Sequence, residues 1–154
     1  MIKAYIDGLT EPINPNGICT YAFIVYNDGK KIYEECNVIG KGIGFSNNVA
    51  EYTALVNALK YLYLHFRDED ITIYTDSQLV ANQISGRWQA HEGLYLNKFD
   101  EALKLSQMFY KLKVIWIPRE QNQEADALSR QAYEEYCKRS GIPIRYHDFK
   151  LIVK

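Results

Sequence analysis

The sequence lacks the features of a secreted, membrane-bound or zinc-binding protein. Its three cysteines, Cys19, Cys36 and Cys137, are odd in number and form no C-x-x-C pair. We therefore expect free thiols, with a bridge between two of them only in a hyperthermophile. No apolar run approaches a membrane span, and the chain opens on a strand pattern at residues 2–7 without a signal peptide. These absences predict a soluble, cytoplasmic protein.

An excess of positive charge is also missing. The 18 Lys and Arg residues are balanced by 19 Asp and Glu residues, which gives a formal net charge of −1. Proteins that bind nucleic acid usually carry a basic face, so any such surface here must be local. The length of 154 residues, with 47% hydrophobic residues, fits one globular domain, and we expect a monomer.

The order of apolar patterns predicts an α/β fold. Strand patterns occupy residues 2–7, 21–26, 31–38, 71–75 and 113–117. Helical patterns occupy about residues 47–67, 77–84, 94–110 and 122–139. The first three strands should form an antiparallel meander, with a loop at 8–17 and a tight turn at Asn27-Asp28-Gly29. This order predicts a mixed sheet with helices packed on its faces.

Four acidic residues occupy positions where charged side chains are uncommon. Asp7 and Asp76 end strands, Glu51 opens the first long helix, and Asp126 lies in the first turn of the last helix. Each has a simpler reading as a turn residue, a helix cap or a first-turn acid. As a set they indicate a divalent-metal site, because crowded carboxylates are costly unless cations neutralise them. Oxygen ligands without a Cys or His cluster suit Mg²⁺ or Mn²⁺.

Four ordered motifs resemble type 1 ribonuclease H over nearly the whole chain. They are Tyr5-Ile6-Asp7-Gly8, Asn47-Asn48-Val49-Ala50-Glu51-Tyr52, Tyr74-Thr75-Asp76-Ser77-Gln78, and Trp116-Ile117-Pro118-Arg119-Glu120-Gln121-Asn122 with Ala125-Asp126. The resemblance implies a ribonuclease H-like fold, a mixed five-stranded sheet flanked by helices. It also implies hydrolysis of the RNA strand of RNA–DNA hybrids by two Mg²⁺ ions, for which Mn²⁺ could substitute.

The same resemblance assigns the four carboxylates as catalytic metal ligands. Asp7 would bridge both ions, and Asp126 would complete the ion that activates water. Glu51 and Asp76 would complete the ion on the leaving-group side. Such a two-ion clamp needs no protein nucleophile.

Three polar residues resemble minor-groove contacts to the hybrid: Asn14, Asn48 and Gln78. Recognition of this kind reads duplex shape and the 2′-hydroxyl group rather than base sequence. Asn48 has an equally good reading as a helix N-cap. Double-stranded RNA, which shares the A-like backbone, is therefore a second possible substrate.

The chain departs from the family in the loop before the last helix. Many members carry a histidine there, whereas this loop reads Pro118-Arg119-Glu120-Gln121. This resembles an archaeal and plant-like subgroup, in which Arg119 could act as a catalytic donor to phosphate, or remain a solvated loop residue. The three histidines of the chain, His65, His91 and His147, lie elsewhere and are expected at the surface.

The basic protrusion of some family members is also missing. Between Gln83 and Lys98 the sequence offers Arg87 as its positive charge, and Trp88 is expected in the core. Substrate binding should therefore depend on the groove near the metals. A rival hypothesis is a non-catalytic nucleic-acid-binding module with the same fold, against which the intact acidic set argues.

The C-terminal residues have their own pattern. Phe149, Leu151 and Val153 alternate with other residues to the end of the sequence. We therefore divide the single domain into a catalytic core at residues 1–143 and a docked strand or extended tail at 144–154.

Overall fold

A five-stranded mixed sheet forms the centre of the protein, as the sequence predicts. The computed structural model describes residues 1–90 and 93–147. The strand order is β3-β2-β1-β4-β5, in which β1, β2 and β3 are antiparallel neighbours and β4 and β5 run parallel to β1. The strands are β1 (Ile2–Glu11), β2 (Ile18–Asn27), β3 (Lys30–Lys41), β4 (Asp70–Thr75) and β5 (Lys111–Trp116).

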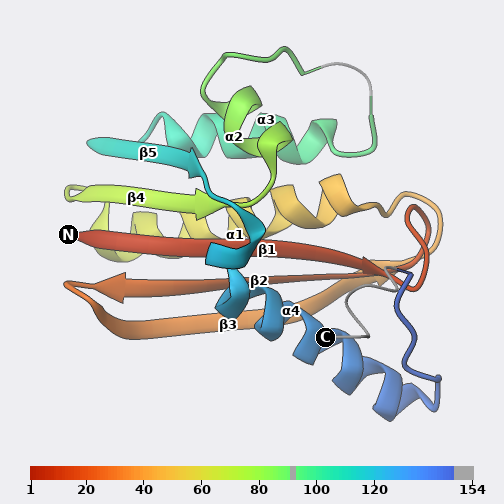
Figure 1. The fold of residues 1–154 in the computed structure, drawn as a ribbon. Helices are drawn as coiled ribbons and strands as arrows, with labels where there is room; N and C mark the ends of the chain where they lie inside the picture. The colour runs from red at the N-terminus through yellow and green to blue at the C-terminus, as the bar shows by residue number, and fades with distance from the viewer. Residues whose placement is uncertain (91–92, 148–154) are drawn as a thin grey trace.

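Helices cover both faces of this sheet (Figure 1). The helices are α1 (Asn47–Phe66), α2 (Gln78–Ile84), α3 (Leu96–Ser106) and α4 (Gln123–Ser140), with a single turn η1 (Arg119–Gln121) before α4. On one face, α1 packs on Ile6, Phe23 and Ile73 in the main hydrophobic core. On the other, Ala125 and Leu128 of α4 pack on β2. None of the helices in the described residues has the length and hydropathy of a membrane span.

Side chains alternate between the two faces of the sheet along β1, so the consecutive residues Asp7 and Gly8 face opposite sides. Ile6 faces α1, so Asp7 faces α4, and Gly8 faces α1 again. A Cβ atom at Gly8 would lie 2.3 Å from the Ala50 carbonyl carbon and 2.4 Å from the Glu51 nitrogen. Only a glycine allows this backbone-to-backbone approach.

The structure corrects several sequence-based boundaries, including the start of β2, which lies three residues earlier than predicted, at Ile18, and the end of β3, which lies three residues later, at Lys41. We predicted a loop from residue 8, whereas β1 continues to Glu11 because Leu9, Thr10 and Glu11 pair with β2. The third helix is shorter than predicted at both ends, and β5 starts two residues earlier, at Lys111. The turn into β3 is as predicted, with Asp28 and Gly29 at φ +51° and +82°.

Two predictions on single residues have different outcomes. All three cysteines, which lie in the described residues, are free thiols, as expected. Trp88 was expected in the core, but 46% of its surface is exposed. Trp88 lies in the segment between α2 and α3, where it lines a cavity together with Arg87.

The segment after α4 packs back onto the body of the protein. Gly141 ends the helix in the left-handed conformation, with φ +67°. The Tyr133 hydroxyl then binds the backbone of Arg145, and the Tyr146 hydroxyl donates to Glu134 at 2.5 Å. These contacts hold residues 145 and 146 against α4. The predicted alternation at 149–153 lies outside the described residues.

We predict that Gly8→Ala destabilises the protein by about 1–3 kcal/mol, because the added methyl group meets backbone atoms of α1 that cannot move separately. Urea denaturation measures this change. Gly86→Asn is the control: Gly86 is exposed at φ +83°, no described atom lies within 4 Å of an added Cβ, and Asn tolerates this conformation. Equal stability of the two variants would refute the close approach.

Candidate metal centre

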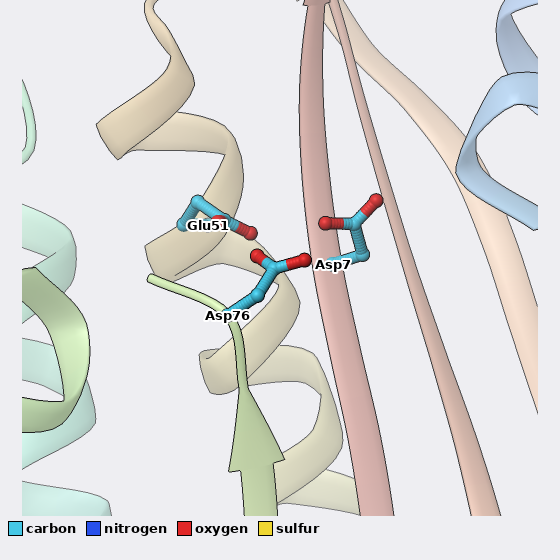
Figure 2. Close-up of side chains that lie close together, drawn as sticks. All are labelled: Asp7, Glu51 and Asp76. Atoms are coloured by element: carbon cyan, nitrogen blue, oxygen red, sulfur yellow. The ribbon is translucent and has the colours of Figure 1, made fainter. Parts of the chain in front are cut away.

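Three carboxylates from three different elements meet beside the carboxyl end of β4. Asp7 lies on β1, Glu51 on α1, and Asp76 directly after β4 (Figure 2). One oxygen from each falls within 4.8 Å of the others. The register explains the pairing of the two aspartates, since β1 and β4 are parallel and pair through Ile6 and Thr75, the residues just before them. In Figure 2, the Asp76 carboxylate lies between the other two.

Neither Asp76 nor Glu51 has the capping role that its position in sequence would suggest. Ser77 is the N-cap of α2, and its hydroxyl accepts from the Val80 N–H at 3.2 Å. Ser46 caps α1 in the same way. Glu51, which was expected to open the helix, is its fifth residue and lies beyond the first turn. Helix capping therefore does not account for either carboxylate.

Side chains from α4 and its N-terminus hold the aspartates from the other face of the sheet. The Ser129 hydroxyl donates to Asp7 Oδ2 at 2.8 Å. The Asn122 amide donates to the Ile6 carbonyl at 2.8 Å and to Asp76 Oδ2 at 3.4 Å. Asn122 stands at the N-cap position of α4 but makes no capping hydrogen bond, and its side chain instead ties the helix to β1 and the acidic site.

The crowding of buried acids changes their ionisation. Burial raises the pKa of Asp7 well above its usual value, and the charges of Asp76 and Asp126 raise it further. Burial likewise raises the pKa of Glu51, with added repulsion from Asp7 and Asp76. Asp76 is also raised by burial, although the Asn122 amide and the Arg119 charge oppose the shift. Without a cation, the site is thus destabilised by its own charge at neutral pH.

The donor set fits a divalent cation. All three side chains offer carboxylate oxygens, the ligands of Mg²⁺ and Mn²⁺. Within the described part of the chain, Glu51 Oε1 is buried and has no hydrogen-bond partner. Buried carboxylate oxygens without partners are costly, so this atom fits a position that a metal ion would fill.

The fourth predicted carboxylate, Asp126, lies outside this triad in the described structure but lines the same cavity. The cavity has a volume of about 300 Å³ and is also bordered by Arg119 and Asn47. Asp126 lies close enough to raise the pKa of Asp7, and its Oδ2 accepts from Arg130 at 3.1 Å. The Arg119 charge lowers the pKa of both Asp7 and Asp76. Both predicted residues therefore belong electrostatically to the acidic site.

The predicted substrate contacts lie at the surface. Asn14, Asn48 and Gln78 are exposed, and Asn48 adjoins Asn47 on the cavity wall. Asn14 Oδ1 accepts from the Asn47 N–H at 2.9 Å, which ties the β1–β2 loop to the start of α1. The cap reading of Asn48 is wrong, since Ser46 is the cap of α1.

Sequence reasoning missed His147. Of the other two histidines, His65 contacts the Tyr61 ring in a tilted arrangement and His91 lies outside the described residues. His147 was expected at the surface, and its side chain is 38% exposed, but it also lines the carboxylate cavity and binds Glu11. No local pattern could reveal this contact, because it joins two ends of the chain.

A larger cavity, of about 530 Å³, lies near the start of β1. Its acids are already neutralised, since Asp28 pairs with the Met1 amino group and Glu124 with Lys31. Size alone would favour this cavity, but the smaller one holds the converging carboxylates and the perturbed pKa values. We therefore assign the candidate site to the smaller cavity.

The mixed sheet, its flanking helices and the acidic cluster between β1, α1 and β4 define a protein of the ribonuclease H-like fold. Residues 17–132 match the family model described as "Reverse transcriptase-like". Ribonuclease HI of Halobacterium salinarum is 33% identical over 134 residues, which are 87% of this chain and 65% of that protein.

Solved structures agree with this result. LC11-RNase H1, determined in complex with an RNA/DNA hybrid, has a TM-score of 0.79 and 28% identity, covering 88% of this chain and 99% of that one. RNase H1 of Halobacterium salinarum has a TM-score of 0.76 and 31% identity, covering 87% and 98%. The chain belongs to the type 1 ribonuclease H family.

We predict that Glu51→Gln raises the melting temperature at pH 7 in EDTA. Because burial puts the folded-state pKa of Glu51 above its ordinary 4.5, its contribution to stability is present below that pH and lost as the pH rises through the raised pKa. The gain in the variant should therefore shrink toward pH 4 and should fall when Mg²⁺ is added.

Glu124→Gln is the control for this experiment, since its shift has the opposite sign. The Tyr26 hydroxyl, with help from Lys31, lowers the pKa of Glu124. This variant should lose stability at pH 7. A lower melting temperature for Glu51→Gln in EDTA at pH 7 would contradict the argument from charge repulsion.

Proposed function

We propose that this chain is a metal-dependent endoribonuclease that hydrolyses the RNA strand of RNA–DNA hybrids. The observation that carries the proposal is the triad of Asp7, Glu51 and Asp76, gathered within 4.8 Å on the fold of a ribonuclease H. The chain spans 65% of the length of the Halobacterium relative, and we extend the activity of that ribonuclease to this chain as part of the proposal. The hybrid bound to LC11-RNase H1 supports the substrate class.

The four carboxylates would together bind two Mg²⁺ ions, or two Mn²⁺ ions in their place. Asp7 would serve both ions, Glu51 and Asp76 would complete one, and Asp126 the other. Bound divalent ions supply positive charge that stabilises the attacking and leaving oxygens of an in-line displacement. The Ser129 hydroxyl and Asn122 amide keep the aspartates oriented for this role. A water molecule would attack the phosphorus and lose a proton to solvent, while the bond from phosphorus to a ribose oxygen would break and that oxygen would leave as a hydroxyl group.

Arg119 would act on the reacting phosphate. It lines the cavity, and its charge is near enough to lower the pKa of Asp7 and Asp76. A guanidinium group at this position can donate to phosphate oxygens and stabilise their charge as the bond breaks. It would thereby supply a catalytic donor in a loop that carries no histidine.

The exposed amides of Asn14, Asn48 and Gln78 would contact the minor groove of the hybrid. An A-like backbone and 2′-hydroxyl groups also occur in double-stranded RNA, which is the second candidate substrate. The rival function is a non-catalytic nucleic-acid-binding module. It does not explain why Glu51 Oε1 is buried without a hydrogen-bond partner. A monomeric, cytoplasmic protein remains our expectation.

We predict that Asp7→Asn and Asp76→Asn abolish hybrid cleavage while the fold is kept. Asparagine preserves the shape but removes the charge that would hold the ions. Gel assays on matched RNA–DNA, RNA–RNA and DNA–DNA duplexes, with Mg²⁺, Mn²⁺ or EDTA, measure the activity, and circular dichroism checks the fold. EDTA should silence the unsubstituted chain. Robust Mg²⁺-dependent turnover by either variant would exclude this site, and an inactive unsubstituted chain would favour the binding-module hypothesis.

We predict that Arg119→Ala lowers kcat about tenfold or more and weakens hybrid binding much less, because its charge acts mainly on the phosphate that reacts. Steady-state kinetics and binding to the inactive Asp76→Asn background separate the two effects. Arg139→Ala, which removes an exposed positive charge from the far end of α4, is the charge-matched control. A loss confined to binding, with a smaller salt dependence, would make Arg119 a phosphate-positioning residue instead.

A further inference from the structure

The C-terminal segment brings a histidine to the carboxylate cavity. His147 lines the cavity together with Asp7, Glu51 and Asp126. Its side chain is 38% exposed, so part of it is open to solvent or to a ligand. An imidazole has two ring nitrogens that can donate or accept hydrogen bonds, which makes it suited to binding a polar ligand.

A buried carboxylate holds this ring in place. Glu11, at the end of β1, has a side chain that is 1% exposed, and its Oε1 lies 2.5 Å from His147 Nδ1. A carboxylate at Nδ1 fixes that nitrogen as an N–H donor and leaves Nε2 as the polar atom available to a ligand in the cavity. Glu11 Oε2 has no hydrogen-bond partner among residues 1–90 and 93–147, whereas Oε1 is bound by both the backbone N–H and the ring of His147.

Anchoring of the chain does not require the imidazole. The His147 backbone N–H already donates to Glu11 Oε1 at 2.7 Å. The Tyr133 hydroxyl holds the Arg145 backbone, and Tyr146 packs on Tyr133 and donates to Glu134. The contact between ring and carboxylate is therefore additional to three other attachments of the segment, and its particular effect is to orient the ring.

We propose that His147 contacts the substrate, with Nε2 binding a phosphate oxygen of the RNA strand in the cavity, and that Glu11 is its positioning residue. The inference rests on the proposed function. Phosphate suits this position for a simple reason. In a doubly protonated imidazole both ring nitrogens are donors, so the ring can donate from Nδ1 to the carboxylate and from Nε2 to a phosphate oxygen. A phosphate oxygen at Nε2 favours that form and makes a charge-assisted hydrogen bond.

The first test is His147→Ala. The matched control is His65→Ala, which removes an exposed histidine in the last turn of α1, outside the cavity lining. On an RNA–DNA hybrid with Mg²⁺, kcat/KM should fall about tenfold or more for His147→Ala and stay within about twofold for His65→Ala. Free imidazole in the buffer should restore part of the activity of His147→Ala and leave the control unchanged. Melting temperatures of both variants are measured in parallel.

A binding measurement gives a readout that does not depend on turnover. In the inactive Asp76→Asn chain, the imidazole NMR signals of His147 should shift when the hybrid is added, and those of His65 should not. The signals are assigned by their loss in the two alanine variants. Unshifted His147 signals in a chain that binds the hybrid would overturn the contact.

Glu11 is tested by a double-mutant cycle. Glu11→Gln keeps an oxygen that can accept from the backbone of His147 but loses the charge that orients the ring. Its cost in kcat/KM should be large when His147 is present and nearly absent in the His147→Ala background. Equal costs in both backgrounds would show that Glu11 acts on the fold alone.

The outcomes separate this inference from the proposed function. If the unsubstituted chain cleaves the hybrid and His147→Ala retains its full rate, the inference fails and the proposed function stands. A loss of rate that imidazole cannot restore, together with a lower melting temperature, would make His147 a structural anchor and would also overturn the contact. If the unsubstituted chain does not cleave the hybrid, the proposed function falls and the NMR titration alone decides the contact; a chain that also fails to bind the hybrid overturns both.

Discussion

The acidic site depends on the contact between the backbones of α1 and β1 at Gly8. Because Gly8 has no Cβ, the helix lies against the strand where a side chain would otherwise hold it away. Glu51 is thereby brought from a helix on one face of the sheet to the strand that carries Asp7. A wider spacing would leave Glu51 in solvent as an ordinary helix acid, without the raised pKa that burial gives it.

The site is supported from both faces of the sheet. Glu51 enters from the α1 side, whereas Ser129 and Asn122 reach Asp7 and Asp76 from the α4 side. Since the hydrogen bonds only partly offset burial, the carboxylates remain in repulsion. The folded protein thus holds unfavourable charge in a cavity bounded by β1, α1 and the start of α4, which is an arrangement that favours binding of a cation.

The sequence reveals the parts of this site that depend on local pattern. A β-branched strand ended by Asp76, and an acid on the buried stripe of a helix at Glu51, can both be recognised without a structure. Residues that act through distant contacts cannot. The Asn122 amide binds a carbonyl 116 positions away and His147 binds Glu11 across 136 positions. Local rules predict a cap for the first and a surface residue for the second, and tertiary packing decides otherwise.

The balance of charge links metal binding to substrate binding. A chain with a net charge of −1 offers a phosphate backbone little general attraction, and an acidic cavity without cations repels it. Bound cations would reverse the sign of the cavity, so that Arg119 and His147 would act beside them on the same phosphate. Because coupling between ligands is reciprocal, a hybrid bound at this site would in turn tighten the binding of the ions. Affinity for the duplex would then depend on the metal-loaded site more than on the rest of the surface.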